Sequence, residues 1–564
     1  MRKKIDILIK SGTIVDGSGS EPFKGDVGIA GDKIVFIHRN TELTGQKYQV
    51  KAERIIEARD MIVAPGFIDT HAHSEFTLLA DPRAEGKICQ GITTEINGNC
   101  GLSAAPLYGE TLKQREGDLE ELYIRERWTT FKEYCEILEG RAISLNFVTL
   151  AGHGNIRACV AGYQDRKLTD SDRREMCQLL KDAVLEGAAG LSSGLIYPPG
   201  VFSDTEELIE LCRVLSLPDK RTVIKSPQPH FSKVGQKRTN EKKGMPGIYT
   251  SHMRSEGDKL IESVEETIRI AKESGIRVHI SHIKTSGEKN WHKIDNALSI
   301  IGMAKNKGLG VTADRYPYTA ASTDLDTILP SWVYEGGSEE EIKKLKSKDL
   351  REQIKKEIVK DHPDMKYWEN TYVSSVLSEK NRWTEGKSIA SIARRKGYEP
   401  VDMLFKILID EKLRAGAIFS SMNEENLKRF LSLPYVMIGT DSSARSLSGI
   451  THRGKPHPRG FGSFPRFLGK YVREDSLMNL SEAIRKITHL PGETFGIHRR
   501  GMLQEGAFAD IVVFDFRKIL DKATYSDPFV RPEGIYYVIV NGRPAVWEGE
   551  LTDIRAGRVL RHGR

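Results

Sequence analysis

The chain has 564 residues, more than one ordinary domain needs, and a large barrel with added segments would account for this length. Hydrophobic residues make up 39% and charged residues 29%, the composition of a soluble globular protein. The net charge of +7 is modest, and no dense cluster of lysines and arginines with interleaved aromatics suggests a nucleic-acid partner. The most basic stretch, residues 220–243, is predicted to be an exposed loop.

Three features favour a cytoplasmic location. The first residues, Met1-Arg-Lys-Lys-Ile-Asp6, are charged, and no apolar core of a signal peptide follows them. No stretch approaches the roughly 18–20 apolar residues of a membrane span. The six cysteines include no CxxC pair, which argues against a disulfide framework or a structural zinc knuckle. We therefore expect a cytoplasmic protein without a membrane partner.

Both ends of the chain show the apolar–polar alternation of β-strands. Runs such as Ile5-Asp-Ile-Leu-Ile9 and Lys33-Ile-Val-Phe-Ile37 are separated by turn residues. The same pattern returns at Ala509-Asp-Ile-Val-Val-Phe-Asp515, close to the other end. We predict a small β-sandwich domain built from both termini, residues 1–63 and 490–564.

The middle of the chain alternates eight strand-like runs with helix-like segments. The runs end within residues 70–71, 95–100, 146–153, 189–194, 248–252, 278–282, 311–316 and 436–441. Eight βα units in this order predict a TIM (β/α)8 barrel over residues 64–489, whose chemistry lies at the carboxyl ends of the strands. The interval of about 325–422 is too long for one connection. We expect an insertion there after strand seven, which either covers the barrel mouth or forms a surface domain.

Two histidines one residue apart follow the apolar run that ends in Ala64-Pro-Gly-Phe-Ile-Asp-Thr70. On a strand, residues i and i+2 point to the same side, so His71 and His73 can direct two imidazoles at one point, as a shared metal ion requires. His252 and His282 end two later strand runs and are further candidate ligands. Together they predict a metal site at the strand ends.

Cys100 and Asp441 complete the candidate site. Cys100 lies in the turn Asn97-Gly-Asn-Cys-Gly101 at the end of strand two, where a thiolate would bind Zn²⁺ well and could bridge two ions. Asp441 ends strand eight, where a carboxylate beside a metal can accept a proton from water and pass it to a leaving amine. His279 is expected to point into packing or solvent.

The motifs resemble those of the D-aminoacylase (N-acyl-D-amino-acid deacylase) family of the amidohydrolase superfamily, from Ile5 to about Arg561. The matching segments are 65–73, 97–101, 190–200, 251–256, 316–318, 456–459 and 506–515. The resemblance implies a zinc ion held tightly by Cys100, His252 and His282, and a weaker metal position at His71 and His73. It also implies that Asp441 is the general acid and base.

The resemblance further implies that Lys284, Tyr316, Ser322 and Arg459 hold the carboxylate of an N-acyl amino acid. Arginine suits this role because it offers a carboxylate two parallel hydrogen bonds. Many relatives bridge two metals with a carboxylated lysine from strand four. This chain has Gly190-Leu-Ser-Ser-Gly194 there, so Cys100 is the natural substitute. The segment Asp441-Ser-Ser-Ala-Arg445 departs from the family pattern and leaves the substrate preference open.

We therefore expect zinc-dependent hydrolysis of the amide bond of N-acyl-D-amino acids, a small-molecule substrate. The D-configuration comes from the resemblance alone. Two alternatives stay open: a cyclic-amide hydrolase of the dihydroorotase or hydantoinase type, and a non-catalytic barrel with a binding role. The missing lysine on strand four counts against the first, and the complete set of ligands with Asp441 counts against the second. A homo-oligomer also stays open.

Overall fold

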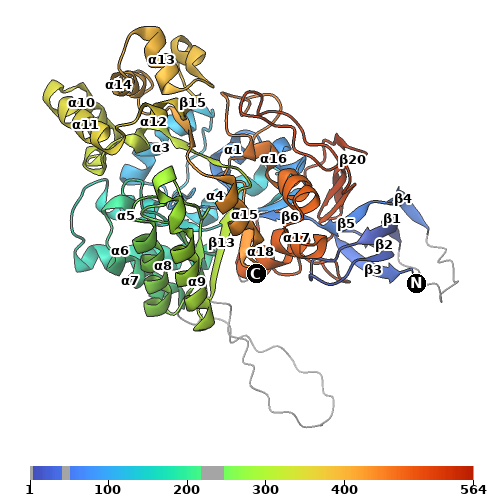
Figure 1. Cartoon of the computed structure of the whole chain (residues 1–564). Coiled ribbons are helices and arrows are strands. Elements are labelled where there is room, and N and C mark those ends of the chain that lie inside the picture. Colours follow the sequence, from blue (N-terminus) through green and yellow to red (C-terminus); the bar gives the residue numbers. More distant parts are fainter. Residues whose placement is uncertain (1–3, 41–50, 217–246, 563–564) are drawn as a thin grey trace.

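The computed structural model describes residues 4–40, 51–216 and 247–562 (Figure 1). The basic stretch at 220–243 lies outside these residues. Within the described ranges, no helix combines the length and the apolar character that crossing a membrane requires.

Eight parallel strands form the centre of the molecule and end where the sequence pattern predicted. In chain order they are β6 (Phe67–Asp69), β7 (Ile92–Asn97), β8 (Asn146–Thr149) with β9 (Ala151–Gly152), β10 (Gly190–Gly194), β11 (Ile248–His252), β12 (Arg277–Ile280), β13 (Val311–Arg315) and β17 (Val436–Ile438). They pair as β6-β7-β8 and as β9-β10-β11-β12-β13-β17. Only Leu150 separates β8 from β9, and its N–H donates to Asn97 O across 2.8 Å.

The first and last strands close the ring. The Thr70 N–H donates to Ile438 O at 3.5 Å, and Ala72 and Ser442 form a parallel bridge just beyond. A ring of eight parallel strands in chain order is a TIM barrel, and the carboxyl ends of all eight strands therefore meet at one face.

Amphipathic helices cover the barrel from outside. The helix α8 (Leu260–Ser274), for example, buries Leu260, Val264 and Ile270, and ends at Gly275, whose φ of +72° suits glycine. The other helices outside the insertion are α1 (Glu75–Ala80), α2 (Glu85–Ile88), α3 (Gly109–Glu121), α4 (Phe131–Gly140), α5 (His153–Ala161), α6 (Asp170–Glu186), α7 (Thr205–Ser216), α9 (Ile294–Asn306), α15 (Glu424–Ser432), α16 (Arg459–Arg466), α17 (Leu480–Ile487) and α18 (His489–Thr494).

Strands from both ends of the chain share one mixed sheet of nine strands. Its N-terminal members are β1 (Ile5–Ile14), β2 (Phe23–Ala30), β3 (Lys33–Arg39), β4 (Ala52–Glu57) and β5 (Ile62–Pro65), and its C-terminal members are β18 (Ile511–Phe514), β19 (Ile535–Val540), β20 (Arg543–Trp547) and β21 (Glu550–Leu551). The two halves join where β5 pairs antiparallel with β18. Only Gly66 separates β5 from β6, so this sheet runs directly into the first barrel strand.

Between β13 and β17 the chain forms a unit with its own hydrophobic core. Three antiparallel strands, β14 (Ala320–Asp324), β15 (Thr371–Ser375) and β16 (Gly416–Ser420), pack with α10 (Ser338–Lys346), α11 (Lys348–Asp361), α12 (Met365–Glu369), α13 (Ile389–Lys396) and α14 (Pro400–Asp410). Figure 1 shows these helices grouped to one side of the barrel. The strand β14 reaches back to the loop after β10, where Thr323 Oγ1 lies 2.8 Å from Tyr197 Oη.

The contact between the barrel and the terminal sheet can be tested at Phe67. This buried ring stacks on Phe464 at 5.8 Å and meets the Phe514 ring at 6.1 Å. We expect Phe67→Ala to lower the free energy of unfolding by about 3–5 kcal/mol, because it removes these contacts and leaves a cavity. Urea unfolding followed by circular dichroism measures this loss. Tyr123→Ala, at a side chain that is 79% exposed, should stay near the wild-type value.

Candidate metal centre and catalytic site

His71 and His73 follow strand β6 at the face where the strands end, but only His71 belongs to a group of converging donor atoms. His71 is fully buried, and its Nε2 lies 3.2 Å from the Sγ of Cys100. Its other nitrogen, Nδ1, lies 3.1 Å from Asp314 Oδ2. A carboxylate at Nδ1 keeps the proton on that nitrogen and leaves Nε2 free to bind a metal ion. His73 extends further out, and its Nε2 lies 3.2 Å from Asp441 Oδ1.

Cys100 lies in a tight turn that contacts the fourth barrel strand, β10. Its φ is +54°, and the N–H of the following Gly101 donates to Ser192 Oγ across 3.0 Å. A Cβ on Gly194 would come within 2.0 Å of Cys100 O, so only glycine allows this approach. Strand four therefore contributes support for the thiol-bearing turn in place of a metal-bridging lysine.

His252 and His282 approach Cys100 from strands β11 and β12. The Nε2 of His282 lies 3.5 Å from Cys100 Sγ. The ring centroids of His252 and His282 are 4.4 Å apart. Neither ring nitrogen of His252 has a hydrogen-bond partner among the described residues, although the ring is buried. Buried polar atoms are almost always satisfied, so this imidazole fits a missing ligand.

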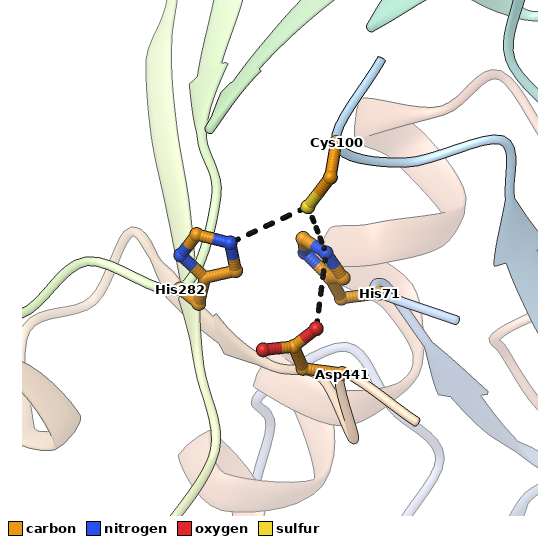
Figure 2. Close-up of side chains that lie close together, drawn as sticks. All are labelled: His71, Cys100, His282 and Asp441. Carbon is orange, nitrogen blue, oxygen red and sulfur yellow. Dashed lines mark hydrogen bonds and ion pairs between the residues drawn. The ribbon is translucent and has the colours of Figure 1, made fainter. Parts of the chain in front are cut away.

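The donor atoms converge as a metal site requires. Atoms of His71, Cys100, His282 and Asp441 all lie within 4.8 Å of one another, as do atoms of His252, Glu256 and His282. Figure 2 shows the first group turned toward a common centre. A thiolate with several imidazoles is the donor set that suits Zn²⁺, so these residues fit that ion.

Asp441 lies at the end of β17 with both carboxylate oxygens engaged. Oδ1 is 3.2 Å from His73 Nε2 and 3.6 Å from His71 Nε2, while Oδ2 is 2.8 Å from Arg459 Nη1. Burial would raise the pKa of Asp441, but the charges of Arg459 and His71 hold it well below its ordinary value. The carboxylate is therefore kept ionised, the form that a proton acceptor must have.

The cysteine is held as a thiolate by its neighbours. Burial would raise the pKa of Cys100, but the nearby imidazoles of His71, His252 and His282 bring it well below the ordinary value. For His73, burial lowers the pKa, but the hydrogen bond to Asp441 raises it to about 9. The Cys100 shift reflects positive charge on the surrounding histidines, and the His73 shift reflects the negative charge of Asp441 and Cys100.

The residues predicted to hold a carboxylate lie around the Tyr316 ring, with one difference in detail. The Arg459 guanidinium carbon lies 4.7 Å from the centre of that ring and the Lys284 Nζ 5.9 Å. The hydroxyl of Tyr316 is buried and has no partner within the described ranges. Ser322 contacts Arg459 through its backbone carbonyl, at 3.0 Å from Nη2, whereas its hydroxyl donates to Ala417 O.

Sequence reasoning missed two carboxylates that orient the histidines. Asp314 accepts from the His282 N–H at 2.7 Å and also contacts His71 and His279, the latter at 2.8 Å from Nε2. Glu256 Oε1 lies 2.7 Å from His282 Nδ1 and pairs with Lys284. Asp314 stands in the predicted strand run 311–316 and Glu256 in the motif segment 251–256, and carboxylates in those segments were the available signal. His279 is buried, as one of its two expected placements had it.

Comparison with known proteins places the chain in a family. The model of the amidohydrolase family matches residues 54–208 and 371–546. The chain therefore belongs to the amidohydrolase family.

Within that family the chain falls with the D-aminoacylases, which confirms the resemblance found in the motifs. It is 33% identical over 557 residues to the D-aminoacylase of Alcaligenes xylosoxydans xylosoxydans, covering 98% of this chain and 97% of the relative. An N-acyl-D-glutamate deacylase from Bordetella bronchiseptica, solved with zinc and a phosphonate inhibitor, is 30% identical with a TM-score of 0.78, covering 99% and 100%. A D-aminoacylase structure described as having a binuclear metal centre is 31% identical with a TM-score of 0.77, with the same coverage.

The role of Cys100 can be tested by metal analysis. We expect Cys100→Ser to weaken zinc binding by at least about tenfold, because even the loss of an outer partner of a metal ligand costs 10- to 100-fold. Zinc retained after dialysis, measured by elemental analysis, reports this change. Cys177→Ser, a half-buried thiol on α6, should keep the wild-type zinc content. Equal zinc in both variants would contradict the assignment.

Proposed function

We propose that this protein hydrolyses the amide bond of N-acyl-D-amino acids and releases a carboxylate and a free D-amino acid. The observation that carries the proposal is that two groups of side chains, the donor cluster and the Arg459 site, lie next to each other at one face of the barrel. A thiolate–imidazole cluster lies on one side of Asp441, and Arg459 lies on the other at 2.8 Å. Such a site brings together a metal, a proton acceptor and a binding group for a carboxylate.

Zinc is the cofactor of the proposed reaction. Cys100, His252 and His282 would hold one ion tightly, and His71 and His73 would form a second, weaker position with the Cys100 thiolate between them. The unsatisfied ring of His252 supports the first position. When bound, zinc acts as a Lewis acid that polarises a carbonyl and lowers the pKa of water to about 7. The solved relatives are described with zinc and with a binuclear centre, in agreement with this cofactor.

Asp441 is the proposed general acid and base. Its ionised carboxylate accepts a proton, at the oxygen next to His73, from the water that attacks the amide carbonyl, and returns it to the nitrogen that leaves as the free amine. Arg459 keeps the carboxylate ionised before the reaction begins, and the barrel face confines both groups to fixed positions.

The substrate carboxylate would lie at the Tyr316 ring. Arg459 can offer it two parallel hydrogen bonds, Lys284 a point charge, and Tyr316 the hydroxyl that otherwise lacks a partner. Ser322 would act through the carbonyl that fixes Arg459 Nη2. This arrangement explains why an acyl-amino acid, rather than a simple amide, is the proposed substrate class.

A cyclic-amide hydrolase is the alternative on the same fold. That chemistry relies in many relatives on a bridging lysine from strand four, and here Gly194 packs against the Cys100 backbone instead. A non-catalytic barrel would give no reason for Asp441 to stand beside the donor cluster. The linear N-acyl-D-amino acid therefore remains the favoured substrate.

We propose the following organisation of the chain. Residues 1–63 and 490–564 form the small β-sandwich domain, residues 64–489 the barrel, and about 325–422 the insertion after strand seven. We also propose a cytoplasmic location. The partner is the small-molecule substrate, and a homo-oligomer is left for measurement in solution.

The reaction is tested with pairs of N-acetyl-D- and N-acetyl-L-amino acids. We expect the zinc-loaded protein to release free amino acid from the D-series only, measured with ninhydrin. A chelator should abolish this release, and added zinc should restore it. Hydrolysis of a hydantoin or of dihydroorotate at a higher rate than any acyl-amino acid would favour the alternative function.

Replacement of Asp441 tests the proton-transfer step. We expect Asp441→Asn to lower kcat by roughly 10²- to 10⁴-fold, the usual contribution of general acid–base catalysis, while zinc remains bound. Steady-state kinetics and elemental analysis on the same sample separate the two effects. Asp165→Asn, at an exposed position, serves as the control. A normal kcat in the metal-loaded Asp441 variant would show that another group moves the proton.

Replacement of Arg459 tests the carboxylate site. We expect Arg459→Lys to lower kcat/KM by roughly 10- to 100-fold, because lysine keeps the charge but loses a hydrogen bond of the guanidinium fork. The matched control is Arg453→Lys, whose guanidinium pairs with Glu121 elsewhere. If both variants kept the wild-type kcat/KM, the substrate carboxylate would bind at another place.

A further inference from the structure

A fully buried lysine lies between the first and last strands of the barrel. The side chain of Lys87, on the short helix α2, has no exposed surface. Its ammonium donates to Asp69 Oδ2 at 2.7 Å, to Thr440 Oγ1 at 2.8 Å and to Ser442 O at 2.9 Å. The carboxylate of Glu95 lies 3.3 Å away. Neither the metal cluster nor the substrate carboxylate site uses this charge.

Two of these partners flank the proposed catalytic residue. Thr440 precedes Asp441 and Ser442 follows it, so the Lys87 ammonium hydrogen-bonds to the residues on both sides of Asp441. Asp69 also fixes Thr440. Its Oδ1 accepts from the Thr440 N–H at 2.8 Å, and its Oδ2 accepts from the Thr440 hydroxyl at 2.6 Å.

Asp441 needs such support because of its backbone conformation. Its φ of +50° lies in the left-handed region, which residues with a Cβ seldom occupy unless their surroundings impose it. The Asp441 N–H donates to His71 O at 2.7 Å, and Ser442 O also accepts from the His73 N–H at 3.3 Å. The same few bonds therefore set both the turn at Asp441 and the strand that carries the two histidines.

We propose that Lys87 is a positioning residue for the reaction, acting through Thr440 and Ser442 to hold the Asp441 carboxylate in place. The inference rests on the proposed role of Asp441 in the deacylation. We expect Lys87 to affect kcat rather than substrate or zinc binding, because its ammonium is buried away from the substrate carboxylate site and contacts no proposed metal ligand. A lysine that only stabilised the barrel would affect folding and leave kcat of the folded enzyme unchanged.

The sharpest test uses Thr440. Removal of Lys87 itself would leave the buried carboxylates of Asp69 and Glu95 without their positive partner and could prevent folding. Thr440→Val keeps the shape but removes the hydroxyl that links Lys87 and Asp69, whereas Thr440→Ser keeps that hydroxyl. We expect Thr440→Val to lower kcat about 10- to 100-fold, the cost of a small misplacement of a reacting group, with KM within about threefold of wild type and zinc content unchanged. Thr440→Ser should stay close to wild type.

A second pair of variants tests the lysine directly. Lys87→Arg keeps the charge but alters the geometry, and we expect a loss of kcat with unchanged zinc. Lys355→Arg is the control, because Lys355 lies on α11 in the unit between β13 and β17 and its ammonium pairs with Asp402 Oδ2 at 2.6 Å. A thermal midpoint for each variant shows whether a lost rate reflects unfolded protein.

The outcomes separate this inference from the proposed function. Equal kcat values for Thr440→Val and Thr440→Ser would overturn it, as would a loss of kcat that matched the loss of zinc. Should the wild-type protein hydrolyse no N-acyl-D-amino acid, the proposed function fails on its own. Crystal structures of wild type and Thr440→Val then decide, since the inference requires the Asp441 carboxylate to move from its place 3.2 Å from His73 Nε2, and an unmoved carboxylate would refute it.

Discussion

The closure of the barrel between its first and last strands is the constraint on which the site depends. Asp69 and Thr440 are separated by 371 positions in the chain, yet they share two hydrogen bonds. His71 and His73 lie on one side of this seam and Asp441 on the other. Because the two sides are fixed to each other by buried bonds, the distance between the imidazoles and the carboxylate is set by the fold rather than by flexible loops.

A second constraint comes from strand four. The close contact between Gly194 and the Cys100 backbone leaves no room for a side chain at that position, and strand four, β10, carries no lysine. In the proposed site the Cys100 thiolate would take the bridging place, on a turn that Ser192 holds. The strand that lacks a lysine is therefore also the strand that supports the turn of Cys100.

The sequence allowed the strand ends and the donor residues to be predicted because both follow from local patterns. Apolar runs locate strands, and in a parallel barrel every such run ends at the same face, so residues far apart in the chain could be grouped without coordinates. Partners inside the barrel could not be found in this way. Asp314 precedes an arginine on an ordinary strand, and only the closed barrel shows that it contacts His71, His279 and His282. Lys87 lies in a short helix whose sequence has no repeating pattern, so its partners could not be predicted. The contact of Ser322 with Arg459 uses the backbone carbonyl, whose direction the side-chain type does not indicate.

The unit between β13 and β17 also affects the order in which the site is made. It folds around its own core and contributes strand β14 to the neighbourhood of Arg459, but it delays the arrival of the last barrel strand. On a ribosome that adds roughly 5–20 residues each second, all five proposed thiol and imidazole ligands up to His282 emerge well before Asp441. The growing chain would therefore possess the proposed metal ligands before the proposed proton-transfer group, and in this proposal hydrolytic competence begins only when strand β17 closes the ring.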